Sequence, residues 1–162
     1  MSEWDNFIHK GTLDEERFAQ RHLTNIKWSN NYQNVREHWD MEGSINGKTS
    51  KFDVKGMKRK NRWDKNTQDE CAWVEGTNVH GDIGWIKGKA NYIVFERGEY
   101  WLAVNRQELW DFVSEKLKKN SYPTGKKPYH VYDRSQWGRK DKITLVPYTD
   151  IELLKDVIKL EK

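Results

Sequence analysis

The chain has 162 residues, of which 35% are hydrophobic and 33% charged, and its 29 Lys and Arg against 25 Asp and Glu give a formal net charge of +4. This length fits a single domain over residues 1–162, and nine Trp, seven Tyr and five Phe exclude a disordered chain because they supply a large apolar area to bury. No apolar run is long enough to cross a bilayer, no signal-peptide pattern opens the chain, and the single cysteine excludes an internal disulfide, so we expect a soluble cytoplasmic protein without a membrane partner.

Three capping patterns predict helices, because each has Thr or Asn followed three residues later by Glu and then by apolar residues at helical spacing. We expect these helices over about 13–26, 106–119 and 150–160. Alternating apolar residues predict strands at 36–45, 48–56, 71–75, 90–96, 100–104, 129–133 and 142–146. The segment 119–128 is expected to be an exposed connection. This order predicts an α/β (mixed α+β) domain with a central mixed β-sheet flanked by helices.

Asn46-Gly47 predicts a tight hairpin turn, because both residues tolerate the positive φ that a type I′ turn requires. With these two residues as the loop, the register of the hairpin is fixed, and Asp40 faces Asp53. Side chains alternate between the two faces of a strand, so the carboxylates share a polar face with Lys55. The opposite face is apolar and carries Trp39, Met41, Phe52 and Val54.

Directly opposed carboxylates repel each other, so the Asp40–Asp53 pair needs a compensating charge. Mg²⁺ prefers carboxylate oxygens and is commonly held by one or two carboxylates together with a substrate phosphate. The polar face therefore predicts a Mg²⁺ site, which Mn²⁺ could also fill, next to Lys55. The alternative is an ordinary solvent-facing strand that carries charged residues.

Asp40, followed after twelve residues by Asp53-Val54-Lys55 on the second strand of a hairpin, resembles the PD-(D/E)xK nuclease superfamily. The spacing is most similar to that of Holliday-junction resolvases and of small phage-encoded nucleases, for which the compartment would be the host cytoplasm. The resemblance implies a restriction-endonuclease-like core, Asp40 and Asp53 as Mg²⁺ ligands with the Val54 carbonyl, and Lys55 as the lysine that orients or activates the attacking water. It also implies a catalytic glutamate on the preceding helix, for which Glu16 is the candidate. Trp39 stands where the motif has its proline.

Two further groups are candidates for the site. Glu75 ends a predicted strand and would join the catalytic residues if that strand lay beside the hairpin, whereas an ordinary polar strand end is the alternative. A basic run directly after the hairpin interleaves cations with an aromatic residue, as phosphate-contacting loops do, and solvated surface charge is the alternative. Its cations are Lys58, Arg59, Lys60 and Arg62.

We therefore expect a Mg²⁺-dependent endodeoxyribonuclease that hydrolyses DNA phosphodiester bonds, with selectivity for junctions or branched DNA as one option. The alternative is a non-catalytic nucleic-acid-binding domain on the same fold, and a Trp-rich carbohydrate-binding module is a third option. DNA is the expected partner and RNA stays open. A homodimer would suit symmetrical cleavage of two strands.

Overall fold

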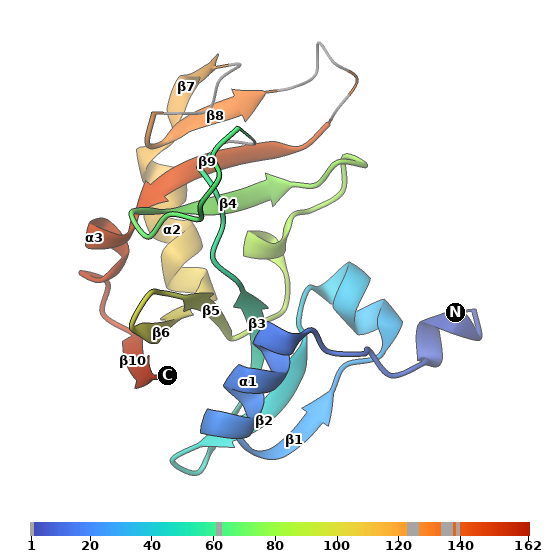
Figure 1. The fold of residues 1–162 in the computed structure, drawn as a ribbon. Helices are drawn as coiled ribbons and strands as arrows, with labels where there is room; N and C mark the ends of the chain where they lie inside the picture. Colours follow the sequence, from blue (N-terminus) through green and yellow to red (C-terminus); the bar gives the residue numbers. More distant parts are fainter. Residues whose placement is uncertain (1, 61–62, 123–126, 134–137, 139) are drawn as a thin grey trace. The chain divides into compact units, whose positions relative to one another are not determined.

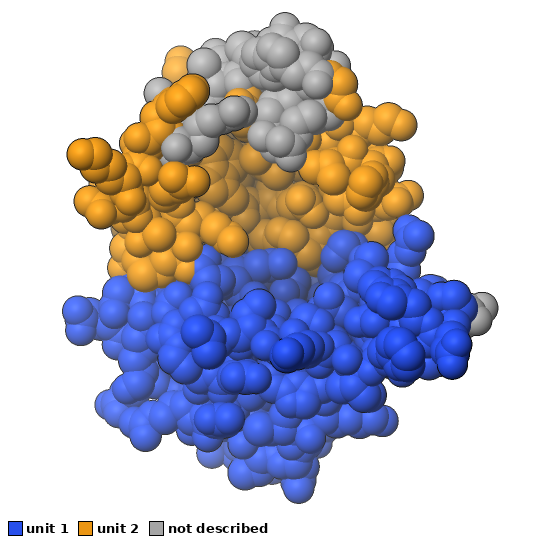
Figure 2. All heavy atoms as spheres, turned by 45° about the vertical axis from the view of Figure 1, so that its right-hand side comes forward, with its two compact units in different colours: residues 1–56, 88–106, 157–162 blue, residues 57–87, 107–156 orange. Residues whose placement is uncertain are grey.

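The computed structural model describes residues 2–60, 63–122, 127–133, 138 and 140–162. The chain divides into two compact units (Figure 2). Unit 1 consists of Met1–Gly56, Gly88–Arg106 and Val157–Lys162, and unit 2 consists of Met57–Lys87 and Gln107–Asp156. The fold is of the predicted mixed α+β class, and each unit is built around its own β-sheet. A single domain over 1–162 stays a prediction.

Unit 1 contains a mixed six-stranded sheet with the strand order β1-β2-β3-β5-β6-β10 (Figure 1). Neighbouring strands are antiparallel except β3 and β5, which run parallel. The strands are β1 (Thr24–Trp28), β2 (Met41–Ile45), β3 (Lys48–Lys55), β5 (Tyr92–Glu96), β6 (Tyr100–Asn105) and β10 (Val157–Glu161). β3 lies between β2 and β5: it pairs with β2 over Lys48–Phe52 and with β5 over Phe52–Lys55, so Asp53 and Lys55 lie on the part that pairs with β5.

The predicted β2–β3 hairpin is confirmed. Asn46 and Gly47 form its turn with φ of 51° and 81°, as a type I′ turn requires. The register runs as predicted from Ile45 opposite Lys48 to Met41 opposite Phe52.

The core of unit 1 lies between this sheet and helix α1 (Leu13–His22), which lies across the β2–β3 hairpin (Figure 1). Thr12 caps the helix as predicted, because its hydroxyl oxygen accepts a hydrogen bond from the backbone N–H of Glu15. Phe18 is fully buried, and its ring lies 5.7 Å from that of Phe52 and 5.6 Å from that of Trp101. The packing of these aromatic rings holds α1 on the strands that carry the polar residues.

The first predicted helix is wrong at its carboxyl end, and the last is wrong over most of its length. The first ends at His22 rather than 26, and Thr24–Trp28 forms β1 instead, paired with β2. The last, predicted over 150–160, is replaced by the short α3 (Tyr148–Ile151) and by β10, which pairs with β6. In both places pairing with a distant strand overrides a local helical pattern.

The strand predicted over 36–45 begins only at Met41. Before it, Gln33–Glu37 form a π-helical turn, η2, and His38 adopts a left-handed conformation with φ of 60°. The regular ladder stops at Met41 opposite Phe52 and does not include Asp40. The backbone N–H of Asp40 still donates to the carbonyl oxygen of Phe52 at 2.8 Å, so Asp40 lies directly beside the end of the hairpin.

Unit 2 contains a four-stranded sheet with the order β4-β9-β8-β7 and helix α2 (Arg106–Lys116), whose Leu109 and Val113 are buried. The strands are β4 (Cys71–Thr77), β9 (Lys142–Pro147), β8 (His130–Asp133) and β7 (Lys118–Tyr122), and two short helical turns are η1 (Trp4–Asn6) in unit 1 and η3 (Trp85–Lys87) in unit 2. β7 occupies part of the expected connection 119–128, whose residues 123–126 lie outside the described residues. Within the described ranges, none of the helices has the length and apolar character needed to cross a membrane.

Candidate metal and active site

Asp40 and Asp53 are both buried, with exposed fractions of 5% and 4%. Asp40 directly precedes β2, and Asp53 lies on the interior strand β3, opposite Ile93 of the parallel neighbour β5. Burial of a carboxylate is costly unless hydrogen bonds or cations compensate for lost hydration. The partners of each carboxylate therefore decide what the pair can do.

The Asp40 carboxylate is held in place by two donors. Its Oδ1 accepts a hydrogen bond from Asn34 Nδ2 at 2.8 Å, and its Oδ2 accepts one from the backbone N–H of Val54 at 2.7 Å. The second of these bonds ties Asp40 to β3, one residue beyond Asp53. Asp40 is thus fixed next to Asp53 although the regular ladder ends before it.

The Asp53 carboxylate is only half satisfied. Its Oδ1 lies 3.1 Å from Lys55 Nζ, while its Oδ2 is buried and has no hydrogen-bond partner among the described residues. The Lys55 side chain is 27% exposed, so its ammonium group can reach both Asp53 and solvent. One oxygen of a buried carboxylate is therefore available to a ligand.

The electrostatics of the pair favour an added cation. Burial raises the pKa of Asp40 well above its ordinary value, the charges of Asp53 and Glu15 raise it further, and the Val54 N–H opposes the shift. Burial also raises the pKa of Asp53, against the effect of the neighbouring Lys55 ammonium. For Asp53 the cost of burial outweighs the opposing effects of Lys55, of His38 and of a side-chain hydrogen bond with Asp40, so its pKa stays raised.

A third carboxylate comes from α1. Glu15 Oε2 accepts a hydrogen bond from the backbone N–H of Thr12 at 2.6 Å and lies 3.1 Å from His9 Nε2, which is 3.8 Å from Asp40 Oδ1. Burial disfavours the charge on Glu15, but the bonds from His9 and Thr12 lower its pKa overall. One ligand atom each from His9, Glu15 and Asp40 lies within 4.8 Å of the others, so the three could also share a metal ion.

The structure places the remaining candidates as follows. Glu16 is half-buried on α1, and the helix carboxylate that reaches Asp40 is Glu15. Glu75 lies on β4 of unit 2, so its part in the site stays a prediction. In the basic run, Lys58 and Arg59 are exposed, Lys60 is half-buried with its Nζ 4.0 Å from a carboxylate oxygen of Glu70, and Arg62 lies outside the described residues.

Three residues of the site escaped sequence analysis: His9, Glu15 and Asn34. His9 lies in an irregular segment and Asn34 in the π-helical turn η2, and no apolar periodicity marks either of them. Glu15 was visible only as a member of the capping box. Comparison of the chain with protein-family models, curated proteins and solved structures finds no match.

Proposed function

We propose that unit 1 is a metal-dependent nuclease that hydrolyses phosphodiester bonds of DNA. The observation that carries this proposal is the buried Asp53 Oδ2, which has no hydrogen-bond partner among the described residues and lies beside a second buried carboxylate and a lysine. A cation bound there would satisfy the free oxygen and offset the repulsion. The spacing of Asp40, Asp53 and Lys55 in the sequence adds the resemblance to PD-(D/E)xK nucleases.

The donor set fits Mg²⁺ or Mn²⁺, because carboxylate and carbonyl oxygens are the ligands these ions prefer. Asp40, Asp53 and the Val54 carbonyl would hold the ion. When bound, such an ion polarises a phosphoryl oxygen and lowers the pKa of a coordinated water.

The protein groups would contribute positioning and charge. The bonds from Asn34 and Val54 to Asp40 hold one carboxylate in a single orientation, which avoids reorganisation during the reaction. The Lys55 ammonium, fixed by Asp53, would orient the attacking water and offset negative charge that builds up on the phosphorus oxygens. Lys55 is therefore the residue that separates catalysis from mere binding.

Cleavage of labelled single-stranded, duplex and branched DNAs in Mg²⁺, Mn²⁺ or EDTA tests the proposal. Lys55→Ala should reduce single-turnover cleavage about 10²- to 10⁴-fold while the protein still binds Mg²⁺. Lys51→Ala is the matched control, because Lys51 lies on the same strand but its Nζ lies over the ring of Trp39 at 5.0 Å. Equal cleavage by Lys55→Ala and wild type would remove the catalytic role of Lys55. Binding of DNA without cleavage in any metal would replace the nuclease by a non-catalytic nucleic-acid-binding domain.

A further inference from the structure

A loop of unit 2 that follows β3 in the sequence is held by hydrogen bonds between its two ends. The Gln68 backbone N–H donates to the carbonyl oxygen of Lys58 at 3.0 Å, and Gln68 Oε1 accepts from the backbone N–H of Cys71 at 2.8 Å, at the start of β4. Arg59 Nη1 donates to the carbonyl oxygen of Asp64 at 3.3 Å. The described part of this loop, 58–60 and 63–68, is therefore anchored to the sheet by specific bonds.

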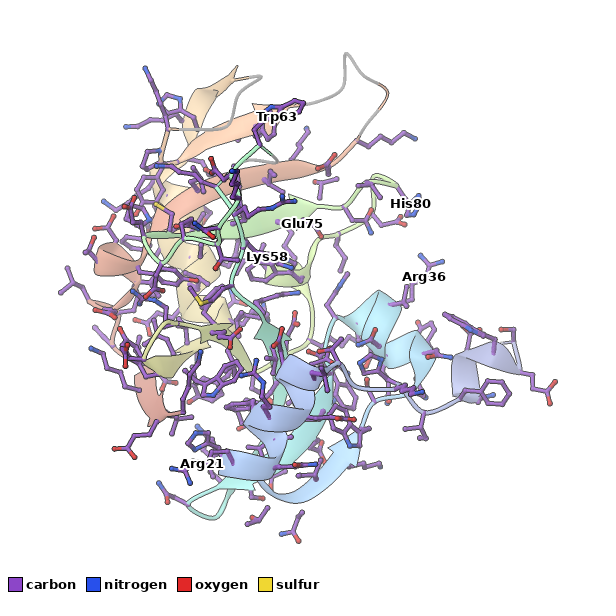
Figure 3. All side chains as sticks on the ribbon, in the orientation of Figure 1. Arg21, Arg36, Lys58, Trp63, Glu75 and His80 are labelled. Carbon is purple, nitrogen blue, oxygen red and sulfur yellow. The ribbon has the colours of Figure 1, made fainter. Side chains whose placement is uncertain are left out.

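This anchored loop carries an indole that is largely in solvent. Trp63, whose side chain is labelled in Figure 3, is 84% exposed. Exposing so much apolar surface is unfavourable, and a loop held by hydrogen bonds cannot fold the ring away at no cost. Such an arrangement favours a ligand with a flat apolar face.

The same loop carries two cations and contacts one of a pair of aromatic residues on the sheet of unit 2. The Nε1–H of Trp73 on β4 donates to the carbonyl oxygen of Arg59 at 3.2 Å, and the Trp73 ring lies 6.3 Å from that of Tyr132 on β8. Lys58 and Arg59 are exposed. We call Lys58, Arg59, Trp63, Trp73 and Tyr132 the aromatic–basic region of unit 2.

We propose that the aromatic–basic region binds single-stranded nucleic acid, with a base stacked on Trp63 and phosphates near Lys58 and Arg59. The choice of nucleic acid as the ligand rests on the function proposed above. Aromatic rings interleaved with cations are the means by which proteins hold single strands without reading sequence. In a duplex the faces of the bases are covered by their neighbours, so an exposed indole gains stacking energy only from unpaired bases. The region therefore favours single strands, or single-stranded parts of branched molecules, over duplex.

The test is fluorescence anisotropy in EDTA with a labelled oligothymidylate of roughly 20 nucleotides, longer than the site of one such module. A duplex of the same length is the comparison. Wild type should bind the single strand more tightly than the duplex. Stacking of one base contributes about 1–3 kcal/mol, so Trp63→Ala should weaken single-strand binding about 5- to 150-fold and leave duplex binding nearly unchanged.

Trp4→Ala is the matched control, since Trp4 is 54% exposed but lies in unit 1, and its affinity should equal that of wild type. Unchanged single-strand affinity in Trp63→Ala would overturn the inference. So would a wild-type dimer that Trp63→Ala converts to a monomer, because Trp63 would then pack against a second copy. Binding is measured without metal, so the outcome of this test does not depend on whether the protein cleaves DNA. A negative result for Trp63 does not affect the nuclease proposal, which Lys55→Ala tests separately.

Discussion

Asp53→Asn should stabilise the metal-free protein, although it removes a buried polar interaction. The substitution keeps the shape of the side chain, removes the repulsion between two buried carboxylates, and leaves Lys55 able to turn towards solvent, since that side chain is 27% exposed. The new amide can also donate a hydrogen bond, which the lone oxygen Asp53 Oδ2 cannot.

The size of the effect follows from the state of that oxygen. A buried polar group without a partner costs about 1–3 kcal/mol, and more when it is charged, so the free energy of unfolding at neutral pH should rise by about 1–3 kcal/mol. Burial raises the folded-state pKa of Asp53 above its ordinary value of 3.8. The cost of ionising Asp53 in the folded protein is therefore absent at a pH below 3.8 and grows as the pH rises through the folded-state pKa. The advantage of the variant should therefore shrink on acidification.

Urea denaturation followed by tryptophan fluorescence measures both effects, in EDTA and in saturating Mg²⁺. Ligand at about 100 times its Kd stabilises the protein that binds it by about 2.7 kcal/mol, so Mg²⁺ should stabilise wild type and leave Asp53→Asn unchanged. The difference in free energy of unfolding between Asp53→Asn and wild type that is measured in EDTA should then shrink or change sign in Mg²⁺. Glu42→Gln, at a half-buried carboxylate on β2, is the control and should respond to Mg²⁺ as wild type does. A variant that is less stable than wild type in EDTA, or that gains as much from Mg²⁺, would refute the reasoning.

Three further outcomes are expected. Glu15→Gln retains an acceptor for the Thr12 N–H, so it should keep α1 intact while lowering the Mg²⁺ affinity, measured by titration, about 10- to 100-fold. Thr12→Ala should instead lower the free energy of unfolding by about 1 kcal/mol and leave the Mg²⁺ affinity unchanged. If Glu15→Gln lowered stability and left the Mg²⁺ affinity unchanged, Glu15 would be purely a helix cap. Replacing Lys58 and Arg59 together by Ala should reduce the salt dependence of nucleic-acid binding, measured between roughly 50 and 200 mM salt. An unchanged slope of log affinity against log salt concentration would show that these cations are only solvated charge. Phe18→Ala should lower the free energy of unfolding by about 3–5 kcal/mol, because the ring is fully buried between two other aromatic rings, and a loss below about 1 kcal/mol would show that α1 does not anchor the sheet.

The carboxylate pair could be predicted from sequence because its position depends on a local feature. A two-residue turn at Asn46 and Gly47 fixes the register as far as Met41 opposite Phe52, and this brings Asp40 close to Asp53. The final placement of the Asp40 carboxylate depends on bonds from Asn34 and from the Val54 N–H, which no local pattern indicates. The sheet as a whole was less accessible. β10 depends on pairing with β6, about fifty residues earlier in the chain, and no local pattern encodes that contact.

Glu16 was the helix carboxylate expected from the sequence, and its catalytic role stays a prediction, whereas the structure brings Glu15 close to Asp40. Glu16 was chosen because it lies on the same side of the helix as Leu13, Ala19 and Leu23. Ala19 and Leu23 are buried, but Leu13 is 78% exposed, and the fully buried Phe18 was not counted in that face. Glu15 precedes Phe18 and Ala19 by three and four positions, the spacing that puts side chains on one face of a helix. With the burial of Phe18 known, the choice would have been Glu15.

The position of the pair argues against a purely structural role. A buried ion pair or carboxylate pair usually contributes less to stability than apolar residues of the same size. Here Ile93, the residue of β5 opposite Asp53, is apolar and fully buried, so it could pack against an apolar substitute. Asp53 Oδ2 nevertheless stays buried without a described partner, at a cost that every metal-free molecule bears. Groups that reduce stability in this way are typically retained at functional sites, where the stabilising interaction arrives with a ligand. Stability in the two metal conditions is therefore a more direct test of the site than cleavage alone, because it depends on neither the substrate nor its structure.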